Sequence, residues 1–310
     1  MGLEHLRELL IRLARPILRQ GASLAYGGNW KETEDNFTYD LLRLISAEQE
    51  DNSAGGAETD LQIGILYNHS AWPHYLDISR TIEARWVNAC RIVRVTQQMA
   101  GFADKDIATD VDFENKTPRA IFNAAVTLSA MRHLMMRGTS INIPGVSAPE
   151  IIPPVIARIL LGGRLDGFSG FLPGLFEETL VTLESERPVY ILGGFGGAAE
   201  TLASVVLTSG SERPKELTAS WLAGHNPSLD ELRKNAGNFS MPAMVKSTES
   251  SLDTLFNFLN DARTNPSRVL RTGLSDEDTR ELMRTRNVTT AVNLVRNGLV
   301  ETKKLPPLPA

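Results

Sequence analysis

Apolar positions recur with a helical period in parts of this chain and gather into short runs elsewhere. A spacing of three to four residues predicts helices over Leu3 to Arg19, about Glu34 to Ile45, and about Pro118 to Arg137. Short apolar runs predict strands at Ala22 to Tyr26, from Leu61, from Cys90, at Arg158 to Leu161 and at Pro188 to Leu192. Helices and strands therefore alternate, which is typical of an α/β protein.

The alternation of strand and helix is clearest in the segment from Ala157 to Glu178, ARILLGGRLDGFSGFLPGLFEE. An apolar strand ends in paired glycines, a Gly-rich loop follows, and a helix begins at Gly174. With the strand at Pro188 to Leu192 it predicts a parallel βαβ crossover. We expect a Rossmann-like parallel sheet with helices on both faces.

From Ala198 onward the pattern is mainly helical, which indicates a helical C-terminal extension. The expected organisation is a nucleotide-binding core over residues 1–208, a helical extension packed on it over 209–300, and a flexible Pro-rich tail over 301–310. Ser46 to Asp60 is acidic and poor in apolar residues, so we expect an exposed, disordered loop there.

Composition narrows the partners. The 310 residues hold 32 Lys and Arg against 37 Asp and Glu, a formal charge of −5, so the broad basic surface of a nucleic-acid or anionic-membrane binder is not expected. Cys90 is the single cysteine, which excludes an internal disulfide and a cysteine-based zinc site. No apolar run reaches about 18 residues and no signal-peptide pattern opens the chain, so we expect a cytoplasmic protein.

The histidines do not have metal-ligand spacing: His69 and His74 stand five apart in a predicted loop without a neighbouring Cys or acid. We therefore expect no metal. Ser70 and Ser169 lack the G-x-S-x-G context that exposes a nucleophile.

Glycine turns at strand ends are the main chemical signal. Gly162 and Gly163 end one predicted strand, and the backbone N–H groups of the following loop and helix start can approach a phosphate or ribose. Glu177 and Glu178 follow in the helix's first turn; either they stabilise the helix dipole, or at least one faces a sugar hydroxyl or a positive partner. The turn from Gly193 to Gly197 lacks G-x-G-x-x-G spacing and is either a second ligand-facing turn or a tight turn without a ligand.

The ordered set LAYGGNW, MRHLMM, ILLGGRLDGFSGFLPGLFEE, RPVYILGGFGGAAE and GLSDEDTRELMRTRNVTTAVNLVRNGL resembles the SLOG superfamily. That superfamily joins the DNA-processing protein DprA to the Lonely Guy phosphoribohydrolases. It is similar to the sensor domain of Thoeris anti-phage effectors and to the amino-terminal region of melastatin-type channels. The resemblance implies a Rossmann-like nucleotide-binding fold and covers most of the chain, weakly between Asn29 and Asn115.

The resemblance also implies site residues. Tyr26, Gly27 and Gly28 are similar to the first glycine turn of Lonely Guy enzymes, which faces the nucleotide phosphate. Arg132 resembles the helix-borne arginine beside ribose and phosphate, and the stretch from Gly162 to Glu178 resembles their PGGxGTxxE motif. Here ten residues, 164–173, separate the double glycine from Gly174, and Leu175 stands near the usual threonine. A larger loop suits a larger ligand, such as a dinucleotide or ADP-ribose derivative, whose phosphate Arg164 could pair.

Two functions remain open. The first is a sensor that binds an NAD-derived or ADP-ribose-type nucleotide in bacterial defence or signalling, with self-association into a homo-oligomer or a separate effector chain as its output. The second is an N-glycosidase or phosphoribohydrolase-like enzyme, in which Glu177 or Glu178 acts on the ribose and Arg132 holds phosphate. In both, the nucleotide is ligand or substrate and no separate cofactor is expected. The expected ligand contacts are Tyr26, Gly27, Gly28, Arg132, Gly162, Gly163, Arg164, Gly174, Glu178, Gly193, Gly194, Gly196 and Gly197.

Overall fold

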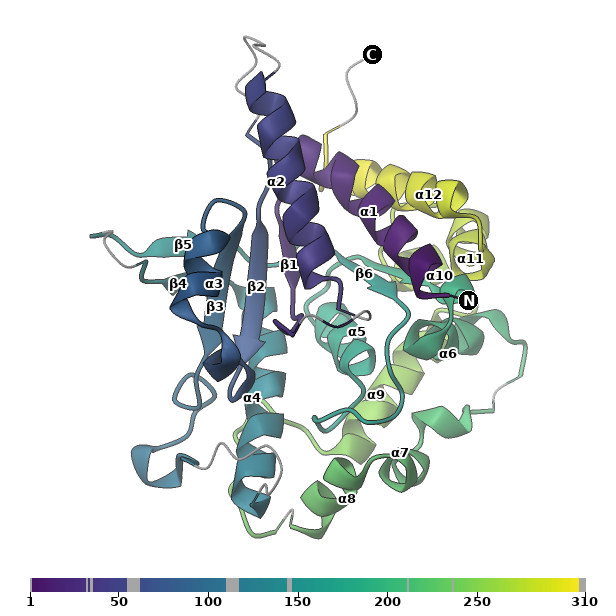
Figure 1. The fold of residues 1–310 in the computed structure, drawn as a ribbon. Coiled ribbons are helices and arrows are strands. Elements are labelled where there is room, and N and C mark those ends of the chain that lie inside the picture. Colours follow the sequence, from purple (N-terminus) through teal and green to yellow (C-terminus); the bar gives the residue numbers. More distant parts are fainter. Residues whose placement is uncertain are drawn as a thin grey trace.

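The computed structural model describes residues 2–31, 33, 36–54, 62–109, 117–143, 147–210, 212–235 and 237–306. Its strands are β1 (Leu24–Tyr26), β2 (Leu66–Ala71), β3 (Cys90–Val95), β4 (Thr139–Ile141), β5 (Glu150–Ile152), β6 (Arg158–Leu161) and β7 (Val189–Leu192). The first three form a parallel sheet in the order β1-β2-β3, and β6 pairs with β7, also in parallel. The antiparallel pair β4-β5 forms a separate arm (Figure 1). The predicted α/β class is confirmed.

Helices flank these strands (Figure 1). They are α1 (Leu3–Arg19), α2 (Thr38–Ala54), α3 (Arg80–Arg85), α4 (Pro118–Arg137), α5 (Gly174–Glu184), α6 (Gly197–Leu207), α7 (Ala219–His225), α8 (Pro227–Lys234), α9 (Thr248–Asp261), α10 (Pro266–Val269), α11 (Asp276–Arg284) and α12 (Val288–Glu301). Short 3₁₀ turns lie at His74–Asp77, Asp104–Asp106, Gly193–Phe195 and Lys215–Leu217. No described helix is long and apolar enough to cross a membrane.

Helices cover both faces of the first sheet. Because side chains alternate along a strand, Cys90 and Ile92 of β3 pack into one apolar cluster with α2, while Val95 packs into another with α4. Between β6 and β7, helix α5 makes the crossover expected of parallel neighbours, and its apolar side chains join those of α6 and α9 in a third cluster. The layered arrangement predicted from the sequence is confirmed.

Helix α4 carries the most important site residue, and local sequence fixes where it begins and ends. The Thr117 hydroxyl accepts the N–H of Ala120 at 3.2 Å, and Pro118 occupies the first turn, where its missing N–H costs nothing. Gly138 ends the helix with a φ of +75°, a conformation that favours glycine. The predicted bounds of this helix, of α1 and of β6 are confirmed.

Two predictions of secondary structure are wrong. The stretch from Ser46, expected to be a loop, continues α2 as far as Ala54, because the Glu48 carboxylate is buried and forms ion pairs with Arg15 and Arg19 of α1. Residues 55–60 of that predicted loop lie outside the described residues. His69, also expected in a loop, lies in β2, which begins at Leu66 rather than at Leu61 and is buried along most of its length.

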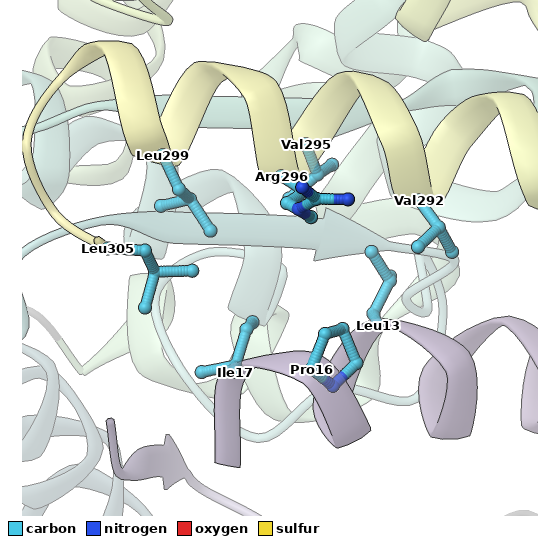
Figure 2. A pocket seen from close by; sticks show the side chains of 8 residues that line it. All are labelled: Leu13, Pro16, Ile17, Val292, Val295, Arg296, Leu299 and Leu305. Atoms are coloured by element: carbon cyan, nitrogen blue, oxygen red, sulfur yellow. The ribbon is translucent and has the colours of Figure 1, made fainter. Parts of the chain in front are cut away.

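The chain's two ends meet at α1 and α12. Figure 2 shows Leu13 and Ile17 of α1 opposite Val295 and Leu299 of α12, with Leu305 closing the crevice between the helices. Leu305 is buried, which differs from the flexible tail expected from 301 onward; residues 307–310 lie outside the described residues. The cavity in this crevice has a volume of only about 10 Å³, far below the roughly 300 Å³ of the smallest ligand pockets, so it is a packing feature.

Candidate functional site

The candidate site lies between helices α4 and α5, and the turn after β1 packs on α4. A Cβ on Gly27 would stand 3.2 Å from the Met131 Cε atom, so this turn rests directly on α4. The next residue along that helix, Arg132, is buried. The first glycine turn therefore packs on α4 one residue away from the predicted arginine, whose side chain leaves the helix in a different direction.

Arg132 meets both predicted carboxylates. Its Nη1 atom donates to Glu177 Oε2, and its Nε atom lies 3.9 Å from Glu178 Oε1. Glu177 is also buried. The sequence left open whether these glutamates only stabilise the helix dipole or face a partner. Each carboxylate faces the Arg132 guanidinium, so the prediction of a positive partner is confirmed.

A second arginine, Arg158 of β6, completes the cluster. It donates from Nη1 to Glu178 Oε2 at 2.9 Å and from Nε to the Thr182 hydroxyl at 3.0 Å. Two guanidinium groups thus balance two carboxylates in a largely buried network, an arrangement that avoids an uncompensated charge in the protein interior.

Two glycines make room for the Arg132 guanidinium. A Cβ on Gly170 would stand 3.5 Å from Nη1, and one on Gly174, at the start of α5, would stand 3.2 Å from Nη2. The Nε atom of Arg132 is buried without a hydrogen-bond partner among the described residues. The start of α5 has no side-chain cap either, since Pro173 occupies the capping position. Of the first N–H groups of α5, those of Phe176 and Glu177 donate to the Pro173 carbonyl.

His69 lies close to this network. Burial, with a smaller contribution from the positive charge of Arg158, lowers the pKa of His69 to about 4. Its Nδ1 atom lies 3.2 Å from the Tyr67 carbonyl oxygen, which can only accept, so Nδ1 carries the proton. The imidazole is therefore neutral near pH 7.

Gly162 and Gly163, which follow β6, pack against the start of α6. Both have positive φ, +62° and +88°, and their carbonyls accept the N–H groups of Ala199 and Ala198 at 2.9 and 3.0 Å. These two donors of α6 are therefore satisfied within the protein. Gly197 packs on the same carbonyls too closely to admit a side chain.

Gly193 and Gly194 face a different part of the chain. A Cβ on Gly193 would stand 2.7 Å from the Met283 carbonyl oxygen, and one on Gly194 would stand 2.6 Å from that of Arg284. Close packing against the end of α11 explains both glycines without a ligand, as the tight-turn alternative requires. Gly196 has no atom within 4 Å of a Cβ position, so it is open.

A family model described as SLOG cluster2 matches residues 1–144 and 149–282. The chain belongs to the SLOG family. The match runs through 29–115, where the sequence resemblance is weak, and ends within α11. SLOG membership makes this a Rossmann-like, nucleotide-related domain. No curated protein matches the chain.

Within this SLOG domain the predicted residues fall into groups. Arg132, Gly174, Glu177 and Glu178 form one cluster, whereas Gly27 packs on Met131. Gly162, Gly163 and Gly197 meet one another, whereas Gly193 and Gly194 lie against α11. Tyr26 pairs with Asn68 of β2, and the Asn68 side chain donates to the Gly28 carbonyl at 2.9 Å. Arg164 is exposed on the loop after Gly163.

Sequence reasoning missed Arg158, Thr182 and His69, which lie in or near this candidate site. A signal for the first was present, since Arg158 is a charged residue at the start of an apolar strand, which needs a buried partner. Glu178 and Thr182 stand one helical turn apart and so share a face toward it. For His69 the wrong assignment of the strand hid the burial. Among the described residues no three His, Cys, Asp or Glu side chains gather as metal ligands; that no metal is used stays a prediction.

Proposed function

We propose that this SLOG chain binds an NAD-derived or ADP-ribose-type nucleotide as a sensor in bacterial defence or signalling. Family membership supports a nucleotide-related role. The observation that carries the proposal is Arg132: a buried guanidinium whose Nε atom lacks a hydrogen-bond partner among the described residues, beside Gly170 and Gly174 at an uncapped helix start.

The chemistry of this place suits a phosphate. Backbone N–H groups at a helix start and a guanidinium are the donors that phosphate oxygens prefer, and glycines let the ligand come close to both. Arg132 would exchange part of its contact with the Glu177 and Glu178 carboxylates for the phosphate. A carboxylate released in this way can accept a ribose hydroxyl, which supports recognition of a whole nucleotide rather than of a bare anion.

The loop of residues 164–173 favours a large nucleotide. It stands between Gly163 and the start of α5, where the Lonely Guy motif has no such loop, and its outer residues, among them Arg164 and Asp166, are exposed. A second phosphate and a second ribose would extend along this loop. The output of such a sensor would be self-association or the binding of a separate effector chain.

An N-glycosidase is the second candidate, and the position of Glu177 and Glu178 beside Arg132 favours it. A glycosidase uses a carboxylate to stabilise an oxocarbenium-like ribose. Here both carboxylates are engaged by arginines, so a substrate would first have to displace a guanidinium. This engagement, together with Leu175 in the motif and the inserted loop, favours binding over turnover.

The test is calorimetric titration with ADP-ribose, AMP and NAD, with released base measured in the same samples. We expect ADP-ribose to bind intact, and Arg132→Met to weaken binding at least tenfold through loss of a charge-assisted contact of about 1.5 to 3 kcal/mol. The control is Arg137→Met, on the same helix with an exposed side chain. Equal binding by both variants would contradict this site, and release of free base would establish the enzyme instead.

A further inference from the structure

The inserted loop is fixed by a residue of the helical extension far along the sequence. Asn226, between α7 and α8, is buried, and its Oδ1 atom accepts the Phe168 N–H at 3.0 Å. Its Nδ2 atom donates to the Leu165 carbonyl at 3.3 Å and to the Leu222 carbonyl of α7 at 2.8 Å. One amide side chain thus binds the loop at two points and ties it to a helix.

A second buried side chain holds the end of the same loop. The Thr248 hydroxyl, in the first turn of α9, donates to the Phe171 carbonyl at 3.0 Å. Figure 1 shows the segment between β6 and α5 extending from the sheet toward α7 and α9, where these two contacts are made. The loop therefore takes its shape from the helical extension.

The loop also reaches the candidate site. Gly170 lies against the Arg132 guanidinium, only two residues beyond the Phe168 amide that Asn226 holds. Farther out, Gly167 has a φ of +60° and no atom within 4 Å of a Cβ position, so the backbone there is open to a ligand. The inner end of the loop, at Gly170, lies against Arg132. The outer part of the loop, around Gly167, forms an exposed rim.

We propose that Asn226 and Thr248 are positioning residues that make the site prefer a nucleotide with two phosphates over a nucleoside monophosphate. This inference rests on the proposed function. A monophosphate needs only Arg132 and the start of α5, whereas a diphosphate-bridged nucleotide extends along the rim and needs its fixed shape. When the loop loses its hydrogen bonds to Asn226 or Thr248, binding must also order the loop. This entropic cost lowers the affinity only for the larger ligand, which contacts the rim.

The experiment compares the affinities for ADP-ribose and AMP by calorimetry in the full chain and in two variants, Asn226→Ala and Thr248→Val. Asn235→Ala is the matched control, because the hydrogen bonds of the Asn235 side chain to described residues are local, to Glu231 of α8 and from Asn238, and none reaches the inserted loop. We expect Asn226→Ala, which removes both hydrogen bonds to the loop, to weaken ADP-ribose binding about tenfold and AMP binding less than twofold. Thr248→Val, which keeps the side-chain shape, should shift the ratio in the same direction even if Asn226→Ala fails to fold.

Hydrogen exchange supplies a readout without ligand. Peptides covering 165–170 should exchange faster in Asn226→Ala, while those of α4 should not change. An unchanged ADP-ribose to AMP ratio in both variants would overturn the inference and leave the proposed function standing. If the unaltered chain binds neither nucleotide, the proposed function and this inference fall together.

Discussion

Removing one arginine from the buried network should reveal how strongly the site is held together. Arg132→Met puts an apolar side chain of similar length in place of the arginine. It leaves Glu177, which is 7% exposed, without the guanidinium that it contacts. Breaking a buried ion pair in this way costs about 3 to 5 kcal/mol, because the remaining charge is desolvated and unpaired. Glu178 retains Arg158, so the loss should fall near the lower value, about 3 kcal/mol.

The assay is urea unfolding at pH 7 of the unaltered chain, Arg132→Met, Glu177→Leu and the double variant. We expect each single variant to lose about 3 kcal/mol and the double variant to lose clearly less than their sum, since removing both partners leaves neither charge unpaired. The control Arg137→Met should stay within about 0.5 kcal/mol. Losses below about 1 kcal/mol in Arg132→Met, or strict additivity, would refute the idea that this pair is a tightly coupled buried unit.

Three further predictions concern stability in urea. His69 has a folded pKa of about 4, below its unfolded value of about 6.5, so the unfolded state takes up its proton first and stability falls as the pH drops through this range. Between pH 7 and 4.5, His69→Asn should lose roughly 2 to 3 kcal/mol less than the unaltered chain, and an equal loss would contradict the buried neutral imidazole. Gly194→Ala should destabilise by about 2 kcal/mol, because its Cβ would press on backbone carbonyls; Gly210→Ala, with open space around it, should be neutral, and similar effects would refute the packing explanation. Glu48→Gln should cost about 1 to 2 kcal/mol by weakening the α1–α2 ion pairs, and the absence of any effect would show them to be dispensable.

Periodicity was enough for the regular elements whose burial matches their pattern. The bounds of α1, α4 and β6 follow from the sequence, since each has a clear apolar face or run between polar or glycine punctuation. The extension of α2 was hidden because its stability comes from Glu48, a polar residue whose arginine partners lie in another helix. A one-dimensional pattern contains no information about such a partner.

Only part of the candidate site was predictable, because some of its residues belong to a sequence motif and others depend on contacts between distant segments. Arg132, Glu177 and Glu178 were identified through their place in a family-like motif, and the fold brings them together. Arg158 and the Asn226 contacts depend on tertiary pairing between distant segments, which the sequence does not display. The glycines at 193 and 194 illustrate the opposite case, in which a ligand-like motif has a complete packing explanation.

Native mass spectrometry of the full chain with ADP-ribose, NAD, cyclic ADP-ribose and AMP tests the central claim most directly, because it records bound mass and released base together. The account predicts a retained intact adenine nucleotide, with ADP-ribose held at lower concentration than AMP, and loss of that retention in Arg132→Met but not in Arg137→Met. Retention of none of the four, or release of free base with ribose phosphate, would contradict it.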